Sequence, residues 1–255
     1  YIMMFVQIKL VSIVILLVMM IPLVGCSSPQ TQHNKTTNLA KHELDNGFTV
    51  LNDNDVFSFV GSLYTIDGFI GSSVLIAPRV SLTAGHCLTT GKPILSVEFG
   101  GTPYEVDYCI SHKTADIGLI FLQEDVTTAK PIEIYQDNTE ISKYTHVIAV
   151  GYSGGKKRMS KFGTLFYYGI LISEPDELQI LPFGGTIWFG DSGGALLTAD
   201  ENGLKLMGIL ISFSKINKTI CENSAVRVDY YKNWIDNKVN GNQQLESLFS
   251  IFNNY

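Results

Sequence analysis

Short apolar segments separated by turn signals recur through most of this 255-residue chain, and they constrain its fold more than any other feature. They are rich in Val, Ile, Phe and Tyr, the residues that favour extended strands. The segments lie at 57–65, 69–76, 94–99, 104–110, 117–122, 147–151, 164–172, 178–181, 195–198 and 204–213. This pattern predicts an all-β chain folded as a barrel or a sandwich.

A helical period is found only near the C-terminus. The apolar residues that share one helical face there are Val228, Tyr231, Trp234, Ile235 and Val239. The Asn-Gly pair that follows predicts the end of this helix. A second stripe predicts another helix, which we expect to cover a barrel surface, with binding of a partner as the alternative. It comprises Leu245, Leu248, Phe249 and Phe252.

The first 25 residues form an apolar segment in which Lys9 is the only charged residue. The uncharged apolar run within it, 10–24, is long for the apolar part of a signal peptide and short for a membrane span. It ends in Leu-Val-Gly-Cys at 23–26, which resembles the bacterial lipoprotein signal. The resemblance implies that 1–25 is a lipoprotein signal peptide and that Cys26 is acylated. An uncleaved membrane anchor is the alternative.

The stretch at 26–43 begins with this cysteine and is rich in Ser, Thr, Gln and Asn. Such composition predicts a flexible tether, which would hold a domain roughly 20 Å from the membrane. We therefore expect the protein in the bacterial cell envelope, anchored by lipid outside the cytoplasm, at the periplasmic face or the outer membrane.

The charge content excludes one class of partner. Only 16% of the residues are charged, the formal net charge is −6, and no run of Lys or Arg is interleaved with aromatic residues. Nucleic-acid binding depends on a basic surface, so no nucleic-acid partner is expected.

Three short segments carry the functional signal. They are Thr-Ala-Gly-His-Cys at 83–87, Asp-Ile-Gly-Leu-Ile at 116–120 and Gly-Asp-Ser-Gly-Gly at 190–194. A serine hydroxyl is a poor nucleophile at neutral pH and needs a base to take its proton and a carboxylate to orient that base. These segments supply such a set in the chain order His, Asp, Ser: His86, Asp116 and Ser192.

These segments resemble the T-A-A-H-C, D-I-A-L-I and G-D-S-G-G motifs of trypsin- and chymotrypsin-like serine proteases. Weaker similarity at 71–76, 150–152 and 228–235 extends the resemblance over about 44–239. It implies a protease domain at 44–255 with two six-stranded antiparallel β-barrels and a C-terminal α-helix. The first barrel would cover about 44–130, and the second barrel with the helices about 131–255.

The resemblance also implies the roles of the site residues. Ser192 would attack the peptide carbonyl, His86 would transfer the proton, and Asp116 would orient His86. The backbone N–H groups of Gly190 and Ser192 would bind the oxyanion. In the family, the residue at Asp191 pairs with a new N-terminus, which we expect at Leu44 after cleavage behind Glu43. That cleavage would also release the domain from its lipid anchor.

Substrate preference is expected to differ from that of trypsin. Thr186 stands where family members that cut after Lys or Arg have Asp. Without that buried negative charge, a cationic side chain loses its partner. The segment Ser212, Phe213 and Ser214 matches the strand that binds the substrate backbone, and Ser214 replaces a common glycine. We expect a pocket for small, polar or modestly apolar side chains.

The cysteines depart from the family pattern. Family partners of Cys87 and Cys221 would lie at Gly71 and Trp188, so both usual disulfides are absent. We take Cys87 and Cys109 as the candidate pair for a single bridge, although sequence does not determine connectivity.

The remaining Cys and His residues lack the close spacing of a zinc site, so neither a metal nor a cofactor is expected. His112 and His146 are expected to be ordinary surface or packed residues.

The sequence thus predicts an exported, monomeric serine endopeptidase that acts on polypeptide substrates. Two alternatives remain open. One is a binding or adhesion module on the same fold, or an inactive precursor. The other is an esterase that uses the same three residues.

Overall fold

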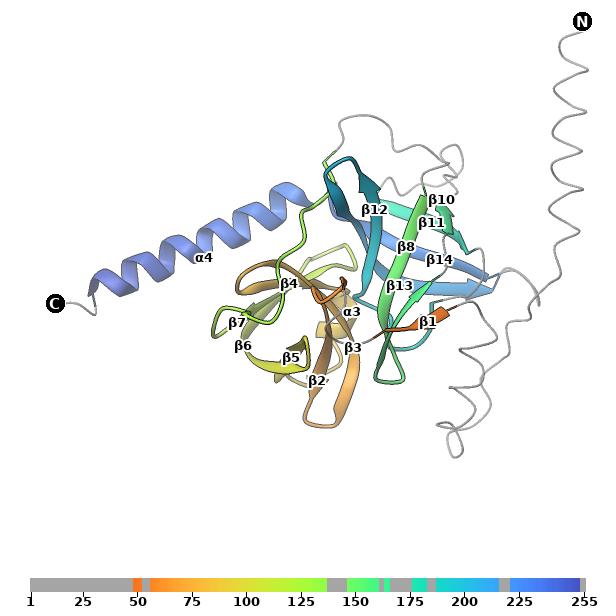
Figure 1. Ribbon diagram of the computed structural model, residues 1–255. Coiled ribbons are helices and arrows are strands. Elements are labelled where there is room, and N and C mark those ends of the chain that lie inside the picture. The colour runs from red at the N-terminus through yellow and green to blue at the C-terminus, as the bar shows by residue number, and fades with distance from the viewer. Residues whose placement is uncertain are drawn as a thin grey trace, which may run out of the picture.

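The computed structural model describes residues 48–51, 56–136, 146–160, 163–165, 176–182, 187–215 and 221–252. Strands dominate these regions, as the recurrent apolar segments predict (Figure 1). The predicted signal peptide, Cys26, the tether and Leu44 lie outside the described residues. They therefore stay predictions.

The first barrel is closed and has six antiparallel strands in the order β2-β3-β4-β7-β6-β5. The residue pattern of its strands matches which of their faces are buried. Along β5, Val97 and Phe99 are buried and alternate with more exposed neighbours, as expected where one face meets the core. By contrast β4 and β7 are buried along their whole length, and β7 is nearly continuously apolar. Strand β4 also buries two hydroxyls, those of Ser81 and Thr83, which are hydrogen-bonded to Ser73 and Ser72 of β3. The strands are β2 (Val60–Thr65), β3 (Gly68–Ala77), β4 (Val80–Thr83), β5 (Ser96–Phe99), β6 (Thr102–Ser111) and β7 (Gly118–Leu122).

The second sheet has eight strands in the order β1-β9-β8-β10-β11-β14-β13-β12. Strand β8 also pairs with β12, so the pairings that run from β8 through β10, β11, β14, β13 and β12 return to β8. The predicted fold class is therefore confirmed. The strands are β1 (Phe48–Val50), β8 (His146–Ser153), β9 (Lys156–Ser160), β10 (Gly163–Leu165), β11 (Glu177–Pro182), β12 (Ala195–Asp200), β13 (Gly203–Lys215) and β14 (Cys221–Arg227).

Strand β1 departs from the predicted barrel boundary. The prediction places 44–130 together, whereas Phe48–Val50 pairs with Ser160–Arg158 of β9 in the second sheet. The backbone N–H of Leu51 continues this pairing with a 2.9 Å bond to the Lys157 carbonyl. The start of the described chain is therefore attached to the second sheet, before β2 enters the first barrel.

One helix closes the described chain, where the sequence predicts two. Helix α4 runs without interruption over Lys232–Phe252, so the predicted stop at Asn240-Gly241 is wrong. Gly241 does not adopt the positive φ of a helix-ending glycine, and a single glycine weakens a helix interior without ending it. In the part of the chain that the structure describes, no helix is apolar and long enough to cross a membrane.

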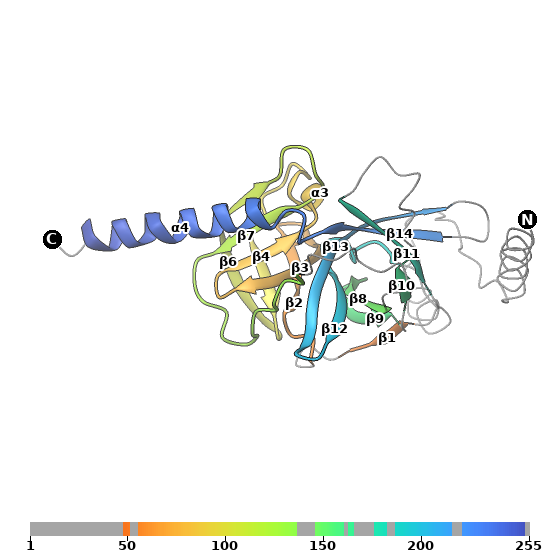
Figure 2. The same cartoon turned by 90° about the horizontal axis from the view of Figure 1, so that it is seen from above.

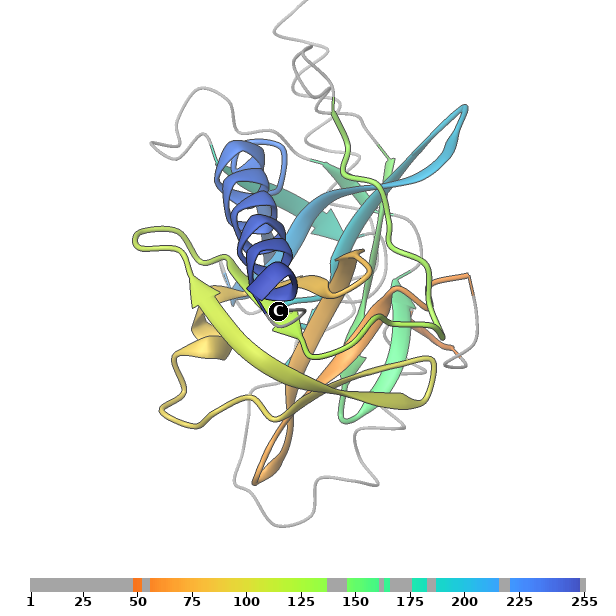
Figure 3. The same cartoon turned by 90° about the vertical axis from the view of Figure 1, so that its left-hand side faces the viewer.

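The predicted apolar face of this C-terminal segment is confirmed. Val228 and Ile235 are buried, and Tyr231, Trp234 and Val239 pack against the same core. Figure 2 shows α4 leaving the second sheet, passing the first barrel and projecting beyond it, and Figure 3 shows the helix nearly end-on. Each end of the described domain therefore contacts the half of the molecule to which it does not belong in sequence. Strand β1 joins the second sheet, and the start of α4 packs against the first barrel.

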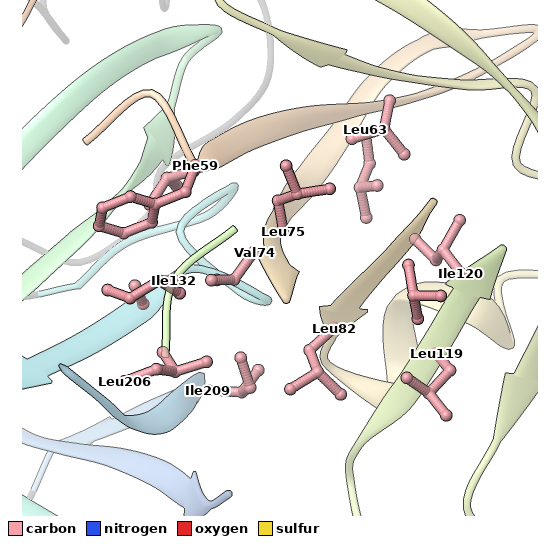
Figure 4. Packing of buried hydrophobic residues seen from close by; sticks show 14 of the residues in the cluster. Phe59, Leu63, Val74, Leu75, Leu82, Leu119, Ile120, Ile132, Leu206 and Ile209 are labelled. Atoms are coloured by element: carbon pink, nitrogen blue, oxygen red, sulfur yellow. The ribbon is translucent and has the colours of Figure 1, made fainter. Parts of the chain in front are cut away.

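The main core spans both halves of the molecule. Leu206 and Ile209 of β13 belong to the same buried cluster as Val74 of β3 and Leu82 of β4. Figure 4 shows these side chains gathered around Ile132, which lies between the halves in sequence. The buried residues of a smaller cluster around Leu196 come only from the second half of the chain. The junction between the barrels is therefore packed core, and this packing fixes the parts of the chain that meet there.

Candidate active site

His86 and Asp116 form a two-point contact at the edge of the first barrel. His86 lies in the short helix α3 (Gly85–Leu88), directly after β4. Its Nδ1 is 2.7 Å from Asp116 Oδ2, and its backbone N–H donates a 2.7 Å hydrogen bond to Asp116 Oδ1. Gly85 leaves room for this approach, because a Cβ there would lie 3.2 Å from Asp116 Oδ1. The carboxylate thus fixes both the backbone and the ring of one residue.

This contact shifts the acid–base properties of both residues. The hydrogen bond to Asp116 raises the pKa of His86 to about 10, with a further increase from the Cys87 side chain, and partial burial of the ring opposes the shift. For Asp116, burial favours the neutral acid, but the hydrogen bonds from the His86 ring and backbone outweigh it and lower the pKa. The resting pair is therefore an imidazolium held by a carboxylate.

The loop that carries Asp116 is held by His112, which the sequence predicts to be an ordinary packed or surface residue. His112 Nδ1 accepts backbone hydrogen bonds from Thr114 at 3.3 Å and from Ala115 at 3.1 Å. Its ring centroid lies 4.9 Å from that of Tyr231 and 5.1 Å from that of Trp234. The start of α4 is therefore packed against the turn that presents Asp116. His146 lies in β8, opposite Thr164 of β10.

Ser192 lies across the barrel junction from this pair. Its backbone carbonyl accepts a 2.8 Å hydrogen bond from the Ser72 N–H and lies 3.9 Å from Cys87 Sγ, next to His86. Its hydroxyl is 3.4 Å from the Ile211 carbonyl. Within the described residues, no hydrogen bond joins the Ser192 and His86 side chains. Such bonds are often long or poorly aligned before substrate binds.

The turn before Ser192 leaves two backbone donors available. Asp191 N–H donates to the Trp188 carbonyl at 2.9 Å and closes a four-residue turn. Gly190 has a φ of +98° within it. Among the described residues, the N–H groups of Gly190 and Ser192 donate no hydrogen bond. An oxyanion site needs two such unused donors.

Asp191 itself points into the protein and is 1% exposed. Its Oδ2 accepts a 2.7 Å hydrogen bond from the Trp188 N–H, so the side chain also stabilises the turn. A Cβ on Gly151 would lie 2.9 Å from Asp191 Oδ1, so only glycine admits the carboxylate there. The predicted partner Leu44 lies outside the described residues.

The predicted substrate pocket is described only in part. Thr186 lies outside the described residues, whereas Ser212, Phe213 and Ser214 lie on β13 and pair with Ser224, Asn223 and Glu222 of β14. Ser212 is exposed, and its hydroxyl lies 3.0 Å from that of Ser224.

Asn223 lies beside the predicted pocket and is not indicated by the sequence. It is 3% exposed, and its Oδ1 accepts a 3.2 Å hydrogen bond from the Ile187 N–H. Because Ile187 directly follows Thr186, this bond fixes the chain beside the predicted pocket position.

The candidate disulfide between Cys87 and Cys109 is wrong. Both residues are free thiols. Cys87 Sγ points toward Gly71, where a Cβ would lie 3.1 Å from it. Cys109 lies on β6 opposite Ile120, and its burial raises the pKa of the thiol to about 11. A half-buried thiol that stays protonated is a poor nucleophile. In the absence of a bridge between these two cysteines, the first barrel is held by strand pairing and packing.

Ser72 is the site residue that sequence reasoning misses most clearly. It lies in β3 and is fully buried, with its hydroxyl 2.6 Å from the Gly190 carbonyl and 2.8 Å from the Tyr152 N–H. The sequence contains two adjacent serines, Ser72 and Ser73, and nothing in their residue type distinguishes them. Only the alternation of the strand decides which of them faces the turn before Ser192.

Comparison with known proteins agrees with the observed fold. A solved structure titled human heparin binding protein has a similar fold, with a TM-score of 0.65 and 17% sequence identity. The match covers 76% of this chain and 96% of that one, and it supports a chymotrypsin-like fold. No curated protein sequence shows significant similarity. Residues 71–209, more than half of the chain, match the trypsin-like peptidase domain. The chain therefore belongs to the trypsin-like peptidase family.

Proposed function

We propose that this protein is a serine endopeptidase in which Ser192, His86 and Asp116 form the catalytic triad. The observation that carries the proposal is the two-point contact between His86 and Asp116, which lies next to the Ser192 backbone. A purely structural ion pair would not require a nearby serine. It would also not require the N–H groups of that serine and of Gly190 to remain unused. That combination is what acyl transfer requires.

The reaction proceeds in two acyl-transfer steps. His86 Nε2 takes the hydroxyl proton of Ser192, whose Oγ then bonds to the peptide carbonyl carbon. The N–H groups of Gly190 and Ser192 bind the resulting oxyanion. His86 returns the proton to the leaving amine, the C–N bond breaks, and an acyl-enzyme remains. Water, deprotonated by His86, then releases the carboxylic acid and restores Ser192.

Membrane attachment through Cys26 and the tether at 26–43 is part of the proposal, with the enzyme monomeric and outside the cytoplasm. Asp191 would bind the new ammonium group at Leu44 after cleavage, because a buried carboxylate gains most from a charged partner. N-terminal sequencing of active protein tests this step. A first residue other than Leu44 would contradict it.

We expect the substrate pocket at Thr186, Ser212, Phe213 and Ser214 to accept small, polar or modestly apolar side chains. Peptide-library profiling tests this expectation, and preferred cleavage after Lys or Arg would contradict it.

A serine-directed phosphonate probe tests the central proposal. The soluble chain beginning at Leu44 should gain one adduct, located on Ser192 by mass spectrometry. His86→Ala should abolish labelling, whereas Asp125→Asn, in an exposed ion pair with Arg79, should leave it intact.

A second form that begins at Ser27 distinguishes an inactive precursor from a non-catalytic protein. Labelling of the Leu44 form alone would indicate that the longer form is a precursor, as the proposed cleavage requires. Absence of labelling in both forms would indicate a binding or adhesion module. If both label but hydrolyse only esters, the protein is an esterase.

A further inference from the structure

Ser72 contacts the turn before Ser192 through its backbone and its side chain. Its N–H donates to the Ser192 carbonyl at 2.8 Å, and its hydroxyl donates to the Gly190 carbonyl at 2.6 Å. The same hydroxyl oxygen accepts a 2.8 Å bond from the Tyr152 N–H, so its donor direction is fixed. Its own carbonyl accepts a 2.8 Å bond from Thr83 Oγ1 on β4. Every polar group of this fully buried residue is therefore engaged.

The hydroxyl acts on the part of the chain whose orientation matters for an oxyanion site. The bond from Asp191 N–H to the Trp188 carbonyl makes Phe189 and Gly190 the central residues of a turn. The φ of +98° at Gly190 fits the third position of a type II turn, where type I requires a negative value. These two turn types differ by a flip of the central peptide, which carries the Gly190 N–H.

We infer that Ser72 is a positioning residue, which holds this turn in the form that directs the Gly190 N–H toward the oxyanion. The inference rests on the proposed function. The peptide that would flip joins Phe189 and Gly190. The Ser72 hydroxyl fixes the Gly190 carbonyl, which directly follows this peptide, and the Ser72 N–H fixes the Ser192 carbonyl two residues later. Since Ser72 belongs to the first barrel and the turn to the second half of the chain, these bonds also set the turn against the barrel that carries His86.

Ser73 provides a matched control. It is equally buried, and its hydroxyl also makes two hydrogen bonds, at 2.7 Å to Ser81 Oγ and at 2.9 Å to the Leu82 carbonyl. Those partners lie within the first barrel, away from the turn. Ser72→Ala and Ser73→Ala therefore remove similar groups from adjacent positions of one strand, and only the first reaches the oxyanion donors.

Steady-state kinetics with a peptide ester gives the first test. Ser72→Ala should lower kcat by about tenfold or more, toward the roughly 10²–10³-fold loss that follows removal of an oxyanion donor, with KM little changed. Ser72→Cys, whose thiol is a weaker donor, should fall in between. Ser73→Ala should keep kcat even if its unfolding midpoint falls. Equal losses of kcat in the two alanine variants would overturn the inference.

Hydrogen exchange of the amides at 187–194 separates this inference from the proposed function. In the full-length protein, Asp191 and Gly194 should exchange faster in Ser72→Ala than in wild type, and at the wild-type rate in Ser73→Ala. Unchanged exchange in Ser72→Ala would overturn the inference even if the enzyme is active. If wild type fails to react with the phosphonate probe but exchange responds as expected, the proposed function fails and the control of the turn by Ser72 stands.

Discussion

At the scale of single residues, the Asp116 carboxylate determines the protonation of His86. It accepts hydrogen bonds from the ring and the backbone of that residue, so it favours the charged imidazole. With a pKa near 10, His86 carries its second proton at neutral pH and is not yet a base. The same shift stabilises the folded protein. Because the folded pKa lies above the ordinary value of 6.5, this contribution is complete below pH 6.5 and is lost as pH rises through about 10.

We predict an alkaline pH profile for the wild-type enzyme. Only deprotonated His86 accepts the Ser192 proton, so kcat/KM should rise with pH between neutrality and about 10. Initial rates with a peptide ester across this range provide the measurement. A kcat/KM that is already constant at neutral pH would show that His86 is deprotonated there despite its contact with Asp116.

Asp116→Asn should lower kcat by about 10³–10⁴-fold, because an amide neither stabilises the imidazolium nor selects the tautomer. NMR titration of the His86 ring should also show a pKa that has moved down toward 6.5. Asp125→Asn, which removes a carboxylate 2.7 Å from Arg79 at the surface, serves as the control and should change neither quantity. A normal kcat in Asp116→Asn would remove this carboxylate from the mechanism.

Gly190→Ala should abolish activity. The added Cβ would lie 2.5 Å from the Tyr152 carbonyl and 2.7 Å from the Phe69 ring, at a φ of +98°. Gly155→Ala is the matched control, since it has a similarly positive φ of +77° but open space around it. Both variants should lose stability through backbone strain, as urea unfolding would show, and only the first should lose kcat. Equal kcat in the two variants would exclude a role for the Gly190 turn.

At the scale of elements, the sequence predicts strands well where they are apolar. The segments at 69–76, 117–122 and 204–213 correspond to β3, β7 and β13 within a few residues. The sequence misses β9, Lys156–Ser160, because its polar residues show no apolar period. The two glycines before it have φ values of +59° and +77° and form the hairpin turn with β8. That Gly-Gly pair is the signal that could have predicted the strand.

The same limit applies at the active site. His86, Asp116 and Ser192 are found from sequence because each lies in a motif that constrains the backbone around it. Ser72 and Asn223 are not found, because they act through hydrogen bonds to chain segments far away in sequence. Such partners depend on the tertiary packing within and between the barrels, which local residue patterns do not show.

Gly241→Ala should stabilise the protein by about 0.5–1 kcal/mol, because alanine favours a helix interior and nothing lies within 4 Å of the new Cβ. Gly203→Ala also has open space but requires a φ of +116°, so it should destabilise. Urea unfolding of both variants provides the comparison. A loss of stability in Gly241→Ala would mean that the helix ends there, as the sequence predicts.

At the scale of the whole molecule, the two halves share one core and exchange their terminal elements. Val74 and Leu206, from different halves, belong to one buried cluster. Strand β1 pairs within the second sheet. At the other end of the chain, Ile235 of α4 lines one groove together with Ile76 and Ala77 of the first barrel. Neither half keeps its buried surface if the other unfolds, so we expect them to unfold together.

The two tryptophans of the chain allow a direct test of this cooperativity. Trp188 lies in the turn before Ser192, and Trp234 lies in α4 against His112. Trp188→Phe leaves one fluorescent reporter, and Trp234→Phe leaves the other. In each variant, the fluorescence midpoint in urea should coincide with the midpoint of the far-ultraviolet circular dichroism. Separate midpoints would show that the halves unfold independently.

The free thiols of Cys87 and Cys109 have a consequence for how the protein is made. The first barrel closes through strand pairing and apolar contacts, so its assembly does not wait for an oxidant or for an isomerase that rearranges incorrect bridges. The first barrel can therefore form equally well in a reducing and in an oxidising compartment, and exposure to reductant should leave it intact.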